Sequence, residues 1–174
     1  MCLHIGSASR LMITSDDAPS AVPITNNYTM SSLSLSDWLL SGVFDRYPNL
    51  RVLYAEAQAG WMPYVVQRLD NLWDQGNAFN RARSVQRPPS TYLHDHVFSS
   101  IFDDVVAIRE LDAIGEDNLC FETDYPHPDS TWPNSRAVAQ KHFGHLDPRL
   151  IHKLVRGNAL RLLGMPPDPV APGS

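Results

Sequence analysis

The amino-acid sequence predicts an α/β fold built on a parallel β-sheet. Three features of the 174-residue chain predict it. Short apolar runs of strand length recur four times, a loop rich in turn residues follows most of them, and a segment with helical spacing of apolar residues closes each unit. Such alternation favours parallel strands joined by right-handed crossovers. Because domains average roughly 150 residues, we expect one domain.

The first unit begins with a strand-like run at residues 1–6. Residues 14–32 are rich in Ser, Asp, Pro and Asn without steady periodicity, so they are expected to form a long loop. A helix is predicted from about Ser36, a favourable N-cap residue, to Tyr47, because Pro48 cannot continue it.

The second unit has an expected strand over residues 51–56 and a helix over residues 61–75. Pro63 falls in the first turn of that helix, where its missing N–H is tolerated. Residues 77–90 are polar and contain two adjacent prolines, which indicates a loop.

The third and fourth units repeat this order. Their predicted strands and helices are, in sequence, a strand at 96–101, a helix at 103–114 closed by Gly115, a strand at 118–123, a loop at 124–131 and a helix at 133–143.

A final helix is predicted between Asp147, its expected N-cap, and Gly164, with Pro148 in its first turn. Residues 1–165 therefore form the expected domain, and the proline-rich segment 166–174 is expected to be a flexible tail.

Composition excludes several classes of function. The chain has fourteen Lys and Arg residues and nineteen Asp and Glu residues, and it contains no basic run. Nucleic acid and anionic membranes are therefore not expected partners. No apolar stretch approaches the roughly 20 residues that span a bilayer, and no secretory signal is recognisable, so we expect a cytoplasmic protein. Cys2 and Cys120 are too few for a disulfide scaffold.

Three polar residues end three of the expected strands: His4, Glu56 and Asp124. In parallel α/β folds the functional groups gather at the carboxyl ends of strands. A carboxylate there can ligate a metal or take a proton from metal-bound water. Each residue alone also fits a structural role: Asp124 as a turn cap, His4 as a hydrogen-bonded core residue, and Glu56 as a solvated strand end.

Other histidines and tryptophans are weaker candidates. His94 and His96 would share one face of a strand, but they precede the apolar run and so fall at its amino end, where a barrel gains stability rather than catalysis. His142, His145 and His152 are expected on the surface. Trp61 and Trp132 follow strands and could wall an apolar pocket or pack in the core.

Several segments resemble the amidohydrolase-related family, which includes aminocarboxymuconate-semialdehyde decarboxylase and related metal-dependent hydrolases on a TIM barrel. The resemblance covers roughly residues 1–165, and the Thr-Asp-Tyr-Pro-His segment is its most specific part. The matching segments are DRYPNLRV at 45–52, Glu56, GWMPY at 60–64, Arg68-Leu69-Asp70, DNLCFETDYPH at 117–127, DSTWP at 129–133 and RGNALRLLG at 156–164.

The resemblance implies a partial (β/α)8 barrel, about the last four βα units plus a C-terminal helix. It makes His4 a metal ligand, and Asp124 both a metal ligand and the group that handles the proton. Glu56, a second catalytic candidate, stands where the family's decarboxylases carry a histidine. His127 and Trp61 are expected to contact the substrate. The implied cofactor is a divalent metal ion, with zinc expected.

The leading functional prediction is a metal-dependent hydrolase acting on a small-molecule carboxylate, amide, ester or lactone. Two alternatives stay open: a carboxy-lyase of the same superfamily, and a non-catalytic half-barrel that binds a partner chain. The expected partner chain is either a second copy, forming a homo-oligomer, or a missing N-terminal half, because uncovered edge strands favour pairing.

Overall fold

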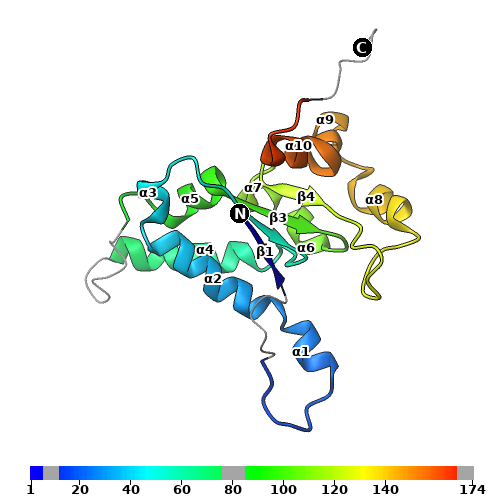
Figure 1. The fold of residues 1–174 in the computed structure, drawn as a ribbon, viewed down its shortest axis with the longest axis horizontal. Helices are drawn as coiled ribbons and strands as arrows, with labels where there is room; N and C mark the ends of the chain where they lie inside the picture. The colour runs from blue at the N-terminus through cyan, green and yellow to red at the C-terminus, as the bar shows by residue number, and fades with distance from the viewer. Residues whose placement is uncertain (6–11, 76–84, 168–174) are drawn as a thin grey trace.

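The computed structural model describes residues 1–5, 12–75 and 85–167. Four parallel strands form one sheet in the order β1-β2-β3-β4, which confirms the predicted α/β class (Figure 1). The strands are β1 Cys2–His4, β2 Val52–Ala55, β3 Val97–Ile101 and β4 Leu119–Phe121. Because sequential strands are neighbours and all run the same way, their carboxyl ends meet along one edge of the sheet.

Helices fill the connections between the strands and follow the last one. They are α1 Ala21–Thr25, α2 Tyr28–Leu40, α3 Val43–Arg46, α4 Met62–Gln75, α5 Pro89–His96, α6 Val105–Arg109, α7 Leu111–Ile114, α8 Ser135–Phe143, α9 Pro148–His152, a π-helical turn η3 Lys153–Gly157 and α10 Asn158–Leu163. Within the described ranges, no helix is both long enough and apolar enough to cross a bilayer.

The main hydrophobic core lies between the sheet and the helices packed on one of its faces. Val52 and Tyr54 of β2 are buried, whereas Leu53 between them is only partly buried, as expected when alternate side chains face opposite sides. Leu35 and Leu39 of α2 belong to the same core. The Tyr54 hydroxyl donates a hydrogen bond to Ser34 Oγ at 3.0 Å, so its polar end is satisfied inside this layer.

A smaller buried group lies outside that core. Phe98 and Cys120 are 1% and 6% exposed, yet neither belongs to the main cluster, which the neighbouring residues Val97 and Leu119 join. The guanidinium of Arg161, in α10, lies 4.9 Å from the centre of the Phe98 ring. Asn158 Nδ2 donates to the carbonyl of Leu119 at 2.7 Å, which fixes α10 to the start of β4.

The first unit differs from the prediction. The expected loop at 14–32 contains α1 and the start of α2. The helix expected at Ser36–Tyr47 is instead two helices: α2, which begins at Tyr28 and ends at Leu40, and α3 at Val43–Arg46. Ser36 is therefore not an N-cap; its hydroxyl donates to the Ser32 carbonyl at 2.9 Å inside the helix. Serine is a weak helix former, and this back-bonding only satisfies the hydroxyl, so the burial of Leu35 and Leu39 is what stabilises the segment as a helix.

The His94–His96 segment is also corrected. It ends α5 rather than beginning a strand. Because α5 begins at Pro89, the loop predicted at 77–90 ends before that residue, and residues 76–84 lie outside the described residues. On a helix, residues two apart point in different directions. His96 is buried, donates to the Leu50 carbonyl at 2.9 Å and stacks on Phe44 at 4.3 Å. Exposed His94 donates instead to the Ala113 carbonyl at 3.0 Å.

The helix expected at 103–114 is two short helices, α6 and α7, that meet at Glu110. The side chain of Asp104 caps α6. His142, expected on the surface, is only 8% exposed and donates to Asp103 Oδ1 at 2.6 Å. His142 belongs to α8, and its ring can be buried because this carboxylate satisfies its Nε2 atom.

The chain's last predicted helix is confirmed at both ends. Asp147 accepts from the Arg149 N–H at 2.8 Å as the N-cap, and Gly164 ends the helix with φ 65°. Between them the helix is interrupted by the π-helical turn, which the periodicity did not predict. Most of the predicted tail, residues 168–174, lies outside the described residues.

Candidate active site

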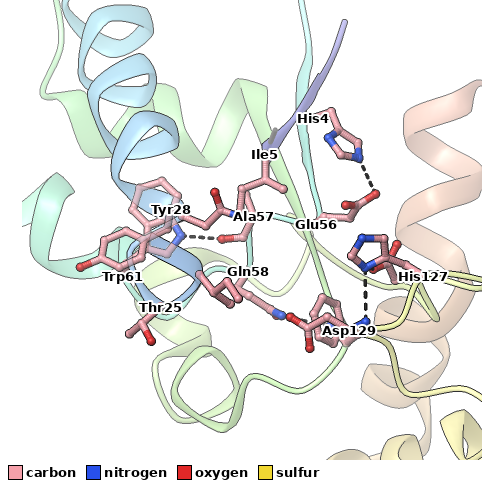
Figure 2. A pocket seen from close by; sticks show the side chains of 14 residues that line it. His4, Ile5, Thr25, Tyr28, Glu56, Ala57, Gln58, Trp61, His127 and Asp129 are labelled. Atoms are coloured by element: carbon pink, nitrogen blue, oxygen red, sulfur yellow. Dashed lines mark hydrogen bonds and ion pairs between the residues drawn. The ribbon is translucent and has the colours of Figure 1, made fainter. Parts of the chain in front are cut away.

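The five predicted site residues line one cavity of about 470 Å3 at the carboxyl edge of the sheet. They are His4, Glu56, Trp61, Asp124 and His127. Figure 2 shows His4, Glu56 and His127 on one side and Trp61 on the other. Three of them, His4, Glu56 and Asp124, were predicted because they end strands, and the parallel sheet brings them together from distant parts of the sequence. His127 and Trp61, expected from the family resemblance, line the same cavity.

His4 and Glu56 form a close pair. The ring atom Nε2 of His4 lies 2.6 Å from Glu56 Oε1, within hydrogen-bonding distance (Figure 2). Their proximity follows from the strand register, in which His4 pairs with Ala55 and Glu56 is the next residue. The His4 side chain is 54% exposed and that of Glu56 is 23% exposed, so the pair is accessible to water.

Both acids at the strand ends have left-handed backbones. Glu56 has φ 61° and Asp124 has φ 54°. For residues other than glycine this conformation costs about 1–2 kcal/mol, so neighbouring contacts must hold it. The N–H of Glu56 points to Glu122 Oε1 at 3.0 Å and to Ser100 Oγ at 3.2 Å. These two acceptors, on β3 and just after β4, hold the turn that presents the Glu56 carboxylate.

The rest of this turn is held by Asp104. Its Oδ2 accepts from the N–H groups of Ala59 and Gly60, both at 2.8 Å, and its Oδ1 accepts from the Ala107 N–H at 2.9 Å. A Cβ added to Gly60 would lie 2.7 Å from Asp104 Oδ1, so only glycine permits this approach. One carboxylate thus caps α6 and fixes the turn that leads to Trp61.

The cavity's acids lie close enough to affect one another's protonation. Burial is the main cause that raises the pKa of Asp124, whose side chain is 12% exposed, and the negative charge of Glu56 raises it further. The charges of His127 and His4 act in the opposite direction. Burial likewise raises the pKa of Glu122, with Glu56 and Asp124 adding to the effect. A carboxyl group that keeps its proton to higher pH is suited to acid–base chemistry.

His127 can interact with two partners through one ring nitrogen. The Asp129 N–H donates to Nδ1 at 3.3 Å, which requires that nitrogen to be unprotonated. The same Nδ1 lies 3.4 Å from Asp124 Oδ2, where a protonated ring would form an ion pair. With its side chain 60% exposed, His127 connects Asp124 to solvent.

Aromatic side chains form the wall opposite the acids. Trp61 stacks with Tyr28 at 5.9 Å between ring centres and an interplanar angle of 21°, and Tyr54 meets the same indole edge-on at 6.4 Å. The Trp61 indole N–H donates to the Ala57 carbonyl at 2.8 Å. Three contacts therefore fix the ring, and its polar atom is already satisfied by the Ala57 carbonyl, a bond drawn in Figure 2.

The donor atoms do not by themselves complete a metal centre. Imidazole and carboxylate groups suit divalent metals such as zinc and manganese. Across residues 1–5, 12–75 and 85–167, however, no three His, Cys, Asp or Glu side chains are placed to hold one ion. The predicted ligands His4 and Asp124 line the same cavity, but their role as ligands stays a prediction.

Three residues that shape the site were not predicted from the sequence: Tyr28, Asp104 and Glu122. Tyr28 fell in the segment expected to be a loop. Glu122 carried a usable signal, because residues two apart on a strand share a face and Glu122 precedes Asp124 by two. Asp104 bonds to a turn that lies 44 and 45 residues earlier, which no local pattern indicates.

Comparison with known proteins identifies the wider group. A family model described as Amidohydrolase matches residues 6–165. The 2-amino-3-carboxymuconate-6-semialdehyde decarboxylase of Dictyostelium discoideum is 29% identical over 140 residues, which are 78% of this chain and 37% of that protein.

Solved structures share the fold. The 5-carboxyvanillate decarboxylase of Sphingomonas paucimobilis matches 80% of this chain and 41% of its own, with a TM-score of 0.67 and 22% identity. The dihydroxybenzoic acid decarboxylase of Polaromonas sp. JS666, whose structure contains manganese and the inhibitor 2-nitroresorcinol, matches 86% of this chain and 48% of its own, with a TM-score of 0.65 and 18% identity.

The chain spans less than half the length of each of these relatives. Its four parallel βα units therefore correspond to part of an amidohydrolase barrel, as the partial-barrel prediction holds.

Proposed function

This chain belongs to the amidohydrolase family, and from that membership we propose that it forms part of the active site of a metal-dependent carboxy-lyase. The substrate class is a small unsaturated or aromatic carboxylate. The relatives named above support decarboxylation, so it replaces hydrolysis of an amide, ester or lactone as the first hypothesis. The observation that carries the proposal is the placement of Asp124, a carboxyl group with a raised pKa, across the cavity from the Trp61–Tyr28 wall.

In this mechanism Asp124 handles the proton. Decarboxylation breaks the bond between a substrate carbon and its carboxylate group, releases carbon dioxide, and leaves that carbon to take a proton. Protonated Asp124 delivers this proton from an Oδ atom, which its burial and the nearby Glu56 charge favour by holding the proton to higher pH. His127, exposed and 3.4 Å from Asp124 Oδ2, returns a proton from solvent.

The aromatic wall binds and orients the substrate. The faces of Trp61 and Tyr28 lie nearly parallel, so they offer flat apolar surface to a planar ring or a conjugated chain. Substrate held against this wall would direct its carboxylate toward the polar side of the cavity, where His4 lies. Because Trp61 is already hydrogen-bonded to the Ala57 carbonyl, little ordering of the ring is needed on binding.

A divalent metal ion is part of the proposal, and no step above depends on it. The Polaromonas relative contains manganese rather than the zinc expected from the sequence, so manganese is the first ion to test. His4 and Asp124 are the ligands proposed in this chain: one Asp124 oxygen would bind the ion while the other handles the proton, and the remaining ligands would come from outside the described residues.

The test separates carbon dioxide release from hydrolysis. The chain is combined with the separately produced N-terminal half-barrel of the Sphingomonas relative, because this chain supplies only part of the proposed site. With Mn2+ or Zn2+ present, the complex is incubated with 13C-carboxyl-labelled 5-carboxyvanillate and dihydroxybenzoate, and labelled carbon dioxide is measured by mass spectrometry. Parallel reactions contain aryl esters and lactones. We expect labelled carbon dioxide from wild type and from Asp112→Asn, an exposed matched control, but not from Asp124→Asn.

Ester or lactone hydrolysis without carbon dioxide release would contradict the proposal. Binding is measured separately, by the NMR shift of the Trp61 indole N–H on adding 2-nitroresorcinol. If neither binding nor turnover occurs, the non-catalytic half-barrel becomes the better explanation, and its open β1 and β4 edges are where a partner chain would pair.

A further inference from the structure

Glu122 is a partly buried carboxylate that the proposed mechanism does not use. It follows β4, and its burial together with the nearby charges of Glu56 and Asp124 disfavours its ionised form. Placing a third carboxyl group here is electrostatically unfavourable, and a residue that only filled space would not need an acceptor oxygen. Its contacts indicate what it does instead.

Those contacts lead to the backbone of Glu56. Glu122 Oε1 accepts the Glu56 N–H at 3.0 Å, across 66 residues of sequence. The same N–H lies 3.2 Å from Ser100 Oγ, and the Ser100 hydroxyl also approaches the Tyr54 carbonyl at 3.3 Å. Glu122 therefore supplies the shorter of the two acceptors for this N–H.

That N–H belongs to a residue in an unfavourable conformation. Glu56 has φ 61°, which residues with side chains adopt only when their surroundings hold them there. In this conformation the Glu56 side chain reaches His4, with Oε1 2.6 Å from Nε2. If the backbone relaxed to a right-handed or extended conformation, the carboxylate would turn away from His4.

We propose that Glu122 is a positioning residue: by accepting the Glu56 N–H, it holds the left-handed turn that aims the Glu56 carboxylate at His4. Glu122 acts here through the reach of its acceptor oxygen, not through its charge. The inference concerns the same cavity as the proposed function, but its test needs neither substrate nor metal, so the two can fail independently.

Two substitutions separate reach from charge. Glu122→Gln removes the charge and keeps an acceptor oxygen at the same distance along the side chain. Glu122→Asp keeps the charge and shortens the side chain by one methylene, which withdraws the oxygen by about 1.5 Å. The purified 174-residue chain is labelled with 15N, and hydrogen exchange of the Glu56 amide is followed by NMR, together with the ring nitrogens of His4.

The expected result is that Glu122→Gln keeps both the slow exchange of the Glu56 amide and the wild-type His4 ring signals. Glu122→Asp should speed exchange of that amide at least about tenfold and shift the His4 signals. Amides of Leu53 and Ser99 serve as internal controls, because they bond to Met1 and Asn118 within the sheet and should not change.

The reverse pattern, with protection kept by Asp and lost by Gln, would overturn the proposal in favour of a purely electrostatic role. Equal protection in both variants would overturn it too. If either variant loses protection at Leu53 and Ser99 as well, Glu122 supports the whole sheet rather than this turn, and the proposal is wrong.

Discussion

Replacing Asp104 with alanine tests how firmly the turn after β2 is tied to α6. The carboxylate accepts three backbone N–H groups, from Ala59, Gly60 and Ala107, at 2.8–2.9 Å. A hydrogen bond to a charged group contributes about 1.5–3 kcal/mol, and loss of an N-cap alone costs about 0.5–2 kcal/mol. The three bonds share one half-buried group and water can replace some of them, so we expect a total loss of about 3–5 kcal/mol.

That loss is large against a typical unfolding free energy of about 5–15 kcal/mol. For a chain of this length each kcal/mol lowers Tm by about 2–4 °C, which predicts a decrease of about 6–20 °C. Urea and thermal unfolding followed by circular dichroism measure both quantities. Asp104→Asn keeps one acceptor oxygen, so its effect should lie between wild type and alanine.

Asp112→Ala is the matched control, because Asp112 is an exposed acid on the neighbouring helix α7. It should change stability by no more than about 0.5 kcal/mol. Amide exchange adds a local readout: Ala59 and Gly60 should exchange faster in Asp104→Ala. A loss below about 1 kcal/mol, with those two amides still protected, would refute the reasoning.

Three further predictions follow from the same structure. The raised pKa of Asp124 means that the folded state binds its proton more tightly than the unfolded state, so ionisation costs stability as pH rises between the two values. Asp124→Asn should therefore have the higher Tm at pH 8, with the difference vanishing below the ordinary carboxyl pKa; a constant difference across pH would contradict this. His96→Ala should lower unfolding stability by about 2–3 kcal/mol in urea, because a buried, stacked ring is lost, whereas exposed His94→Ala should cost less than about 1 kcal/mol. Equal losses would argue against the two environments described. Trp61→Ala should weaken 2-nitroresorcinol binding at least about tenfold by calorimetry, while Trp132→Ala, outside the cavity, should not; similar affinities would show that Trp61 is not part of the binding wall.

The strands and their order could be predicted because each is a local apolar run bounded by turn residues. The strand-end rule then located His4, Glu56 and Asp124, since parallel strands bring their carboxyl ends together whatever the sequence distance. Helices were harder. The serine-rich sequence of α2 is typical of a loop. It forms a helix because residues such as Leu35 are buried against the sheet, which the local sequence does not show.

The contacts that shape the site could not be predicted for a different reason. Glu122 and Asp104 bond to backbone groups 66 and about 45 residues away, and a backbone N–H has no sequence signature. For His94 and His96 a local pattern exists but predicts the wrong structure. Their spacing fits a strand, but α5 continues to His96, whose ring bonds to the Leu50 carbonyl and stacks on Phe44 in the folded chain.

One residue of the apolar wall, Tyr28, comes from a segment separate from the strand ends, and this has an evolutionary consequence. The acids extend from the ends of strands and are held by contacts within and between those ends, whereas Tyr28 enters from the first turn of α2, after a connecting segment of the chain. Substitutions in that segment can therefore remodel the apolar wall while the acids keep their geometry. A library of variants over residues 24–28 would therefore sample new substrate preferences. The sheet, and the acids that handle the proton, would stay unchanged in every variant.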